Sequence, residues 1–219
     1  MTPPTTTAKP GNLDQIAKTY SDRLARYGAT ANGVFWRNAE GQWLRFEKLI
    51  GVIDPCDSDG GITINDLGCG YGALFEVLWH RGFMQHSRYV GYDICRDMLH
   101  EARLRVTHPR AQFINSAVAT MEADYSLVSG TFNMKLDADD KDWARYVEAS
   151  LIDLWSKTRK GLAFNMLSRS RRLLRQGDLY YADWRRYEAF CLGALSPNVT
   201  VLRDYPLAEW TIYVHRRDS

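Results

Sequence analysis

The sequence predicts one α/β protein whose sheet is mostly parallel and carries helices on both faces. From residue 62 onward, short β-rich segments alternate with segments in which apolar residues recur at helical spacing. The segment I-T-I-N-D-L-G-C-G-Y-G-A-L at 62–74 runs from a strand through three alternate glycines into a helix. Such a turn is typical of a ligand-binding site, because a ligand meets no Cβ atoms there. The length of 219 residues matches one ordinary α/β domain.

Two helices are expected before the first strand, at 12–27 and 39–53, because apolar residues recur there at helical spacing. Gly28 and Pro55 mark their ends. Residues 1–11 are rich in Pro and Thr, and we expect them to form a disordered tail. We therefore predict an N-terminal helical cap or lid at 12–60 and a ligand-binding domain at 61–219.

The rest of the chain follows the alternating pattern of a doubly wound sheet. Helices are expected at 73–82, 96–106, 140–158 and 182–194. Strands are expected at 62–66, 88–92, 111–115, 124–129, 161–167, 198–204 and 209–215. Only a short turn around Tyr205 and Pro206 joins the last two strands, so we expect them to be antiparallel neighbours.

The composition argues for a soluble globular protein without a broad charged surface. Hydrophobic residues make up 45% of the chain and charged residues 25%, and the formal net charge is +2. No apolar run approaches the roughly 18 residues that a membrane span needs. The N-terminus has no apolar signal segment. We expect a cytoplasmic monomer or homodimer that binds neither membranes nor nucleic acid.

The four cysteines show neither metal-site spacing nor a C-x-x-C pair. We expect them to be small buried residues in a reducing compartment, and we expect no metal. They are Cys56, Cys69, Cys95 and Cys191.

The glycine turn narrows the kind of ligand. Its G-x-G-x-G spacing differs from the dinucleotide fingerprint G-x-G-x-x-G, and the chain has no P-loop motif. The sequence D-L-G-C-G-Y-G resembles motif I of the class I S-adenosylmethionine-dependent methyltransferases. The resemblance covers 62–215 and implies a Rossmann-like class I methyltransferase fold, with a seven-stranded sheet and an antiparallel last strand. It implies that S-adenosylmethionine contacts the turn, with Asp66, Gly68, Cys69, Gly70, Tyr71 and Gly72 as the binding residues.

Further cofactor contacts are expected where the next strands end. Asp93 ends the second strand, about twenty residues past the last glycine, and its carboxylate suits a ribose diol. The third strand ends in F-I-N-S, where the family often has an acidic residue that contacts adenine. An amide or a hydroxyl could do the same here. The fourth strand leads into S-G-T-F-N, which the resemblance places beside the methionine half. These expectations add Ile94, Asn115, Ser116, Ser129 and Gly130 to the cofactor site.

Arg45, in Q-W-L-R-F on the second expected helix, would suit the carboxylate of the methionine moiety. An equally good interpretation is a packed stem with its charged head in water. Aromatic faces near a sulfonium stabilise it by cation–π contact. Among the aromatic residues, the consecutive Tyr180 and Tyr181 are the strongest candidates, because two neighbouring tyrosines in a polar loop cannot both face one core. The predicted catalytic pocket comprises Tyr20, Trp36, Phe132, Asn133, Tyr180 and Tyr181.

The reaction itself is left open by the sequence. No general base is evident, because four of the five histidines fall in or beside surface helices or loops far from the strand ends, and His215 lies near the C-terminus. Methyl transfer to a small-molecule acceptor is the first hypothesis, and the basic loop at 168–175 could meet an anionic acceptor or be a solvated lid. The chain is also similar to the bacterial azetidine-2-carboxylate synthases of natural-product pathways in its compact size, N-terminal helical cap, S-G-T-F-N segment and pair of tyrosines at 180 and 181. In those synthases the α-amine of S-adenosylmethionine attacks its own γ-carbon and releases methylthioadenosine. The missing base and an aromatic pocket closed by the tyrosine pair favour this second hypothesis. A catalytically silent binding module is the third hypothesis.

Overall fold

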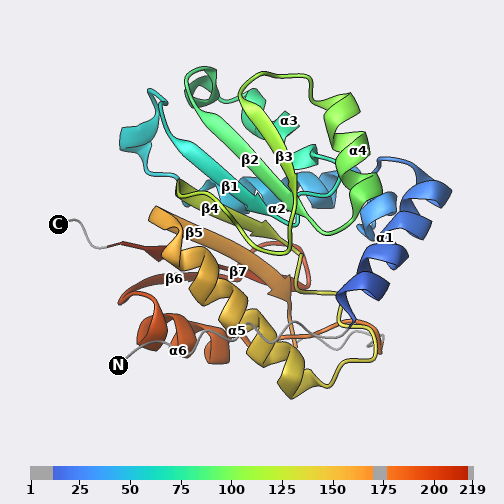
Figure 1. Ribbon diagram of the computed structural model, residues 1–219. Coiled ribbons are helices and arrows are strands. Elements are labelled where there is room, and N and C mark those ends of the chain that lie inside the picture. The colour runs from blue at the N-terminus through green and yellow to red at the C-terminus, as the bar shows by residue number, and fades with distance from the viewer. Residues whose placement is uncertain (1–11, 170–176, 217–219) are drawn as a thin grey trace.

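The computed structural model describes residues 12–169 and 177–216 and contains a seven-stranded sheet with the order β3-β2-β1-β4-β5-β7-β6 (Figure 1). β1 to β5 run parallel, and β7 is antiparallel to both β5 and β6. This confirms the predicted fold class and its antiparallel last strand. The strands are β1 (Thr63–Leu67), β2 (Arg88–Asp93), β3 (Ala111–Asn115), β4 (Ala123–Ser129), β5 (Thr158–Leu167), β6 (Asn198–Leu202) and β7 (Glu209–His215).

Six α-helices and three short 3-10 helices accompany the sheet in the part of the chain that the structure describes. The α-helices are α1 (Leu13–Tyr27), α2 (Ala39–Ile50), α3 (Ala73–Trp79), α4 (Arg96–Arg105), α5 (Asp140–Ser156) and α6 (Trp184–Ala194). The 3-10 helices are η1 (Asn32–Val34), η2 (Pro55–Asp57) and η3 (Gly82–Gln85). Helix α6 begins later than expected, because the Asp183 side chain accepts a hydrogen bond from the Arg185 backbone N–H and caps the helix there.

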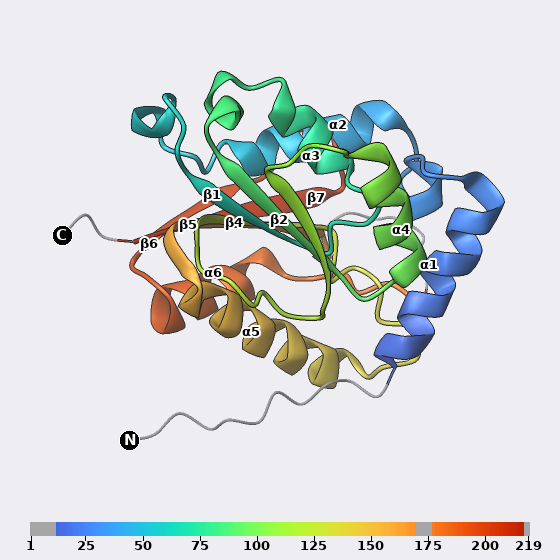
Figure 2. The same ribbon diagram turned by 45° about the horizontal axis from the view of Figure 1, so that its top comes forward.

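Helices cover both faces of the sheet. Figure 2 shows α2 and α3 on one side of it and α5 and α6 on the other. The α2–α3–α4 side is apolar and includes Leu49, Leu78 and Leu99, which are fully buried. On the other side Trp143 of α5 is buried, and its indole N–H donates to the carbonyl of Phe132, 2.9 Å away. Helix α5 therefore holds the segment that follows β4.

The two N-terminal helices pack against different parts of the protein. Helix α1 lies beside α4 at the end of the sheet where the parallel strands finish (Figure 1). Helix α2 instead packs on the sheet, where its Phe46, Leu49 and Ile50 share an apolar cluster with Ile64 and Tyr125. The boundary at residue 60 stays a prediction, but α2 is part of the helical layer because its apolar face matches the sheet beneath it.

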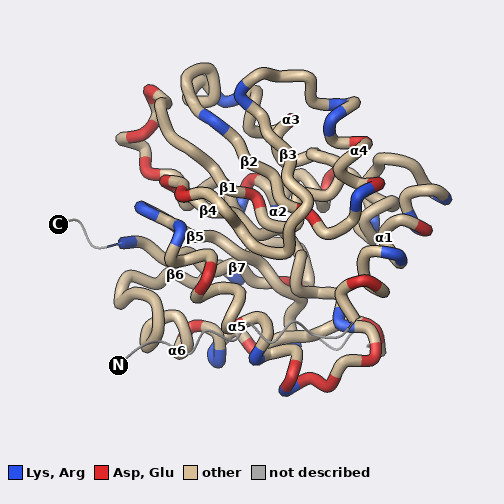
Figure 3. The backbone as a smooth tube through the Cα atoms, viewed as in Figure 1, with Lys and Arg blue, Asp and Glu red and all other residues tan. Residues whose placement is uncertain are grey.

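Charged residues of both signs are spread around the periphery (Figure 3). Within 12–169 and 177–216, no helix is long and apolar enough to cross a membrane. Most of the basic loop at 168–175 and the tail at 1–11 lie outside the described residues.

Candidate functional site

A cavity of about 280 Å³ opens at the carboxyl ends of β1, β2 and β4 and at the start of β7. Its walls come from α1, α2, the glycine turn and the loops that follow β2, β3 and β4. The strand order reverses between β1 and β4, and the crevice at such a point is where open α/β sheets bind ligands. The fold therefore places the cavity at the expected binding position.

The glycine turn forms one side of the cavity and needs its glycines. Gly68, Gly70 and Gly72 have φ angles of +80°, +54° and +83°, which side chains rarely adopt. A Cβ atom on Gly68 would lie 2.2 Å from the Thr131 Oγ1, so only glycine permits this approach to the segment after β4. Gly68, Cys69, Gly70 and Tyr71 line the cavity, whereas Gly72 caps the start of α3.

Asp93 binds the backbone of the glycine turn and also lines the cavity. Its Oδ2 accepts a hydrogen bond from the Gly70 N–H and its Oδ1 accepts one from the Cys95 N–H, both at 2.8 Å. Burial raises the pKa of Asp93 above its ordinary value, and these backbone donors oppose that shift. The carboxylate lines the cavity at the end of β2, the position from which a ribose would be contacted.

Asp66 is the most deeply buried acid of the site, with 1% of its surface exposed. The hydroxyl of Tyr89 donates to its Oδ2, but its Oδ1 has no hydrogen-bond partner in the described part of the protein. Burial raises the pKa of Asp66 to about 7. A buried acceptor of this kind is normally paired, so Asp66 is suited to receive a donor from a ligand.

Of the three residues predicted to contact the cofactor just after Asp93 and at the end of β3, two line the cavity and one does not. Ile94 and Ser116 line the cavity as predicted. Asn115 is not among the described residues that line it, and its amide donates to the carbonyls of Asp93 and Ile94 at 2.9 and 3.0 Å. Asn115 thus braces the loop after β2, because its side chain turns back onto that backbone. The predicted adenine contact fits Ser116 better.

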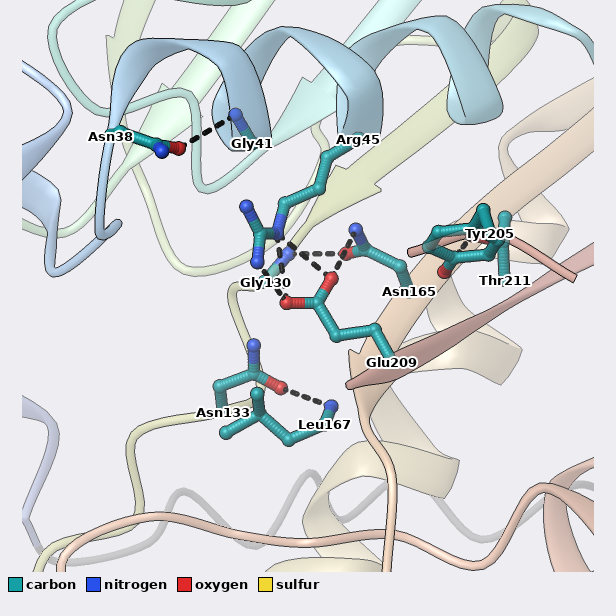
Figure 4. Close-up of polar contacts among 10 residues, drawn as sticks. All are labelled: Asn38, Gly41, Arg45, Gly130, Asn133, Asn165, Leu167, Tyr205, Glu209 and Thr211. Carbon is teal, nitrogen blue, oxygen red and sulfur yellow. Dashed lines mark hydrogen bonds and ion pairs between the residues drawn. The ribbon is translucent and has the colours of Figure 1, made fainter. Parts of the chain in front are cut away.

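The segment after β4 supplies Ser129, Gly130, Phe132 and Asn133, and all four line the cavity. The Gly130 N–H donates to the Oδ1 of Asn165 at 2.7 Å, and the Asn133 Oδ1 accepts from the Leu167 N–H at 3.1 Å (Figure 4). Both bonds tie this segment to β5. They leave the Ser129 hydroxyl and the Asn133 Nδ2 buried without a partner among the described residues.

Arg45 lines the cavity but does not offer a free guanidinium. Its Nε donates to both carboxylate oxygens of Glu209 at 2.8 Å (Figure 4). Its guanidinium also lies 3.9 Å from the ring centre of Trp36. Neither sequence interpretation described this arrangement, because the guanidinium is paired with a protein carboxylate and its head is buried. The predicted carboxylate clamp is therefore not formed by an unpaired Arg45.

Glu209 is the site residue that sequence reasoning missed. It is 3% exposed at the start of β7 and lines the cavity. Burial raises its pKa, and Arg45 opposes that shift. In the sequence, Glu209 could have been noticed as the one acidic residue of the expected strand E-W-T-I-Y-V-H.

The predicted aromatic residues divide into two groups. Tyr20 and Trp36 line the cavity. Burial is the main cause that raises the pKa of the Tyr20 hydroxyl, and the nearby charge of Asp93 raises it further. Tyr180 and Tyr181 are not among the described lining residues. The Tyr180 N–H donates to the Asn133 carbonyl, its ring is buried in the core, and its hydroxyl accepts from Tyr187 on α6. Backbone pairing thus directs Tyr180 toward α6, contrary to the prediction of a pocket-closing pair.

The cysteines are buried at 69, 95 and 191, as expected, but Cys56 is exposed in η2. Among the residues that the structure describes, no group of three or more His, Cys, Asp or Glu side chains is arranged to hold a metal ion.

The fold and the cavity are those of an α/β protein with a ligand-sized cavity at the reversal of its strand order, and the comparisons with known proteins show its family. The family described as "Methyltransferase domain" matches residues 64–150. Over 171 residues the chain is 40% identical to the "Putative methyltransferase Rv1506c" of Mycobacterium tuberculosis (strain ATCC 25618 / H37Rv), covering 77% of this chain and 98% of that protein. The chain belongs to the S-adenosylmethionine-dependent methyltransferase family.

Solved structures support the same fold. Magnesium protoporphyrin IX methyltransferase (ChlM) from Synechocystis PCC 6803 with bound SAH has a TM-score of 0.67 at 15% identity, covering 94% of this chain and 98% of its own. The DhpI–SAH complex has a TM-score of 0.61 at 15% identity, with 95% and 98% covered. The N-methyltransferase NodS from Bradyrhizobium japonicum WM9 has a TM-score of 0.57 at 14% identity, with 82% and 98% covered. At these identities the likeness concerns the fold alone.

Proposed function

We propose that this enzyme transfers the methyl group of S-adenosylmethionine to a small-molecule acceptor held in the cavity. The observation that carries the proposal is a set of buried polar atoms that have no hydrogen-bond partner among the residues that the structure describes. Three such atoms belong to residues that line the cavity: Asp66 Oδ1, Ser129 Oγ and Asn133 Nδ2. They sit beside the glycine turn, whose residues 68–71 line the same cavity. Buried polar atoms are normally hydrogen-bonded, so this cluster fits a polar ligand.

The residues present fit the two ends of the cosubstrate. An acceptor at Asp66 suits the methionine ammonium, and a donor at Asn133 with the hydroxyl of Ser129 suits its carboxylate. Asp93 would hold the ribose diol, and Ile94 and Ser116 would flank the adenine. When bound, S-adenosylmethionine supplies a methyl group already activated by the sulfonium.

The remaining walls of the cavity exclude water and hold the acceptor in line. They combine aliphatic side chains with the aromatic side chains of Tyr20, Phe35, Trp36, Phe132, Trp143 and Tyr146. The names of ChlM and NodS describe methyltransferases, and that of ChlM names a small-molecule substrate. These names support a small acceptor for this chain.

Cyclisation of S-adenosylmethionine finds less support than methyl transfer. Its sequence case depended on the absence of a base and on Tyr180 and Tyr181 closing the pocket. The described cavity contains neither tyrosine, and it contains the Glu209 carboxylate. Mass analysis of the pure enzyme incubated with S-adenosylmethionine alone separates the two reactions. We expect no turnover, and methylthioadenosine with azetidine-2-carboxylate would contradict the proposal.

Binding of the cosubstrate is tested by calorimetry on a matched pair of variants. Asp93 and Asp139 each accept hydrogen bonds from two backbone N–H groups, but only Asp93 lines the cavity. Asp93→Asn should weaken S-adenosylhomocysteine binding at least about tenfold, the equivalent of one charge-assisted hydrogen bond. Asp139→Asn should leave it unchanged. If the wild-type protein binds neither S-adenosylmethionine nor S-adenosylhomocysteine, the proposal fails and a silent scaffold becomes the better description.

A further inference from the structure

Glu209 lies at a part of the cavity that the cosubstrate contacts do not use. Asp66 and Asp93 lie at the carboxyl ends of β1 and β2 and Ser129 ends β4, whereas Glu209 starts β7 on the far side of β5. It is paired in register with Leu167 at the end of β5, and both residues line the cavity. The carboxylate therefore belongs to the acceptor side of the cavity.

Hydrogen bonds from Arg45 and Asn165 hold this carboxylate in place (Figure 4). Arg45 binds Glu209, and Asn165 Nδ2 donates to its Oε2 at 3.4 Å. The Oδ1 of the same Asn165 accepts from the Gly130 N–H. A Cβ atom on Gly130 would lie 2.4 Å from the Trp36 ring, and Arg45 covers that ring. The position of Glu209 is thus coupled to the segment after β4, beside which the methyl group would be transferred.

The other ionisable groups of the cavity are poor proton acceptors for an acceptor molecule. Burial raises the pKa of the hydroxyls of Tyr20 and Tyr146, so they remain protonated at neutral pH. Burial also raises the pKa of the Cys69 thiol. No histidine is among the described residues of the cavity wall. Of the carboxylates in the wall, Asp66 and Asp93 belong to the cosubstrate side, which leaves Glu209.

The surroundings of Glu209 specify the acceptor. Its negative charge is already balanced by Arg45, so the pair offers no net charge to attract an ionic acceptor. The aromatic side chains in the wall, Trp36 and Phe132 among them, favour a flat aromatic body. A carboxylate base is useful to a hydroxyl nucleophile, which must lose its proton as it attacks.

On the premise that the proposed function holds, we propose that the acceptor is an uncharged aromatic hydroxyl compound and that Glu209 receives the proton of its hydroxyl. A lone pair of the acceptor oxygen forms the new bond to the methyl carbon. The carbon–sulfur bond breaks, and its electron pair remains on sulfur. The hydroxyl proton passes to a Glu209 oxygen and then to water when the products leave. No further reactant is required.

The test uses 2-naphthol and 2-naphthoate as probes, because they share a ring system and differ in charge. The wild-type enzyme with methyl-labelled S-adenosylmethionine should convert 2-naphthol to 2-methoxynaphthalene and leave 2-naphthoate unmethylated. Glu209→Gln should lower kcat about 100-fold or more, the usual contribution of a general base. Its affinity for S-adenosylhomocysteine should change less than about threefold, since the variant is nearly isosteric and lies outside the cosubstrate contacts.

A double variant separates this role from a purely structural one. Arg45→Met with Glu209→Leu replaces the buried ion pair by apolar side chains, a change that is often neutral for stability. If Glu209 accepts the proton, the double variant folds and binds S-adenosylhomocysteine but remains as slow as Glu209→Gln. Recovery of 2-naphthol methylation in the double variant would overturn the inference. So would a wild-type enzyme that binds S-adenosylmethionine but does not methylate 2-naphthol, or that methylates 2-naphthoate faster. Loss of S-adenosylmethionine binding in the wild type would instead refute the proposed function itself.

Discussion

Replacing Gly68 by alanine tests why this position of the turn needs a glycine. The reason is either the close packing against Thr131 or the left-handed backbone angle alone. A Cβ atom there would lie 2.2 Å from the Oγ1 and 2.6 Å from the Cγ2 of Thr131. Thr131 cannot easily yield, because it is β-branched and its hydroxyl donates to the Leu67 carbonyl at 2.7 Å. Gly61 is a matched control, because it has the same φ of +80° but no atom within 4 Å of its Cβ position.

The two variants should differ by the cost of the steric overlap. Gly61→Ala carries only the left-handed backbone penalty, about 1–2 kcal/mol. Gly68→Ala carries the same penalty plus an overpacking cost of about 1–3 kcal/mol. For a protein of this size, 1 kcal/mol shifts Tm by roughly 2–4 °C. We therefore expect Gly68→Ala to melt roughly 2–12 °C below Gly61→Ala.

Urea denaturation at 25 °C measures the difference in unfolding free energy, and calorimetry measures S-adenosylhomocysteine affinity. Only Gly68→Ala should weaken binding, because Gly68 lines the cavity and Gly61 does not. Equal midpoints for the two variants, together with equal affinities, would refute the packing argument. The turn would then be a backbone requirement alone.

Three further predictions concern buried groups. Burial raises the pKa of Asp66 from 3.8 to about 7, so the folded state binds this proton more tightly than the unfolded state. Wild-type stability should therefore fall by about 3 kcal/mol more than that of Asp66→Asn as the pH rises from about 4 to about 7. Urea unfolding free energies that change in parallel with pH for the two proteins would contradict this. Tyr180→Phe removes the hydroxyl that accepts from Tyr187 and should lower the unfolding free energy by about 1 kcal/mol. The affinity for S-adenosylhomocysteine, measured by calorimetry, should stay unchanged. Weaker binding would support the predicted role of Tyr180 in the site. Arg45→Ala leaves the Glu209 charge buried without its partner and should lower the unfolding free energy, measured by urea denaturation, by about 3–5 kcal/mol. Arg145→Ala removes one side of an exposed ion pair and should lower it by less than about 1 kcal/mol. Similar losses in the two variants would show that burial of the ion pair does not matter here.

The fold was predictable because its signals are local. Each strand and helix is specified by apolar spacing within about ten residues, and the seven strands appear where that spacing places them. Element ends were less accurate, because caps decide them. Asp183, for example, starts α6 at Trp184 through one side-chain hydrogen bond. The direction of the Tyr180 ring was not predictable, since it depends on the pairing of its backbone with Asn133.

The two sides of the cavity also differ in how far their residues could be predicted from local sequence. The proposed cosubstrate side is built from a turn and the strand ends that follow it. A motif of a few residues pointed to Asp66 and Gly68, and the end of the second strand pointed to Asp93. The acceptor side brings together Arg45 and Glu209, which are 164 residues apart in the chain. Their contact depends on α2 lying on the sheet and on β7 running antiparallel to β5, which places the first residue of β7 at the carboxyl edge. A strand in the parallel direction would have its last residue there instead. The reversed last strand therefore carries Glu209 to the cavity, and this links the topology of the sheet to the chemistry of the proposed acceptor site.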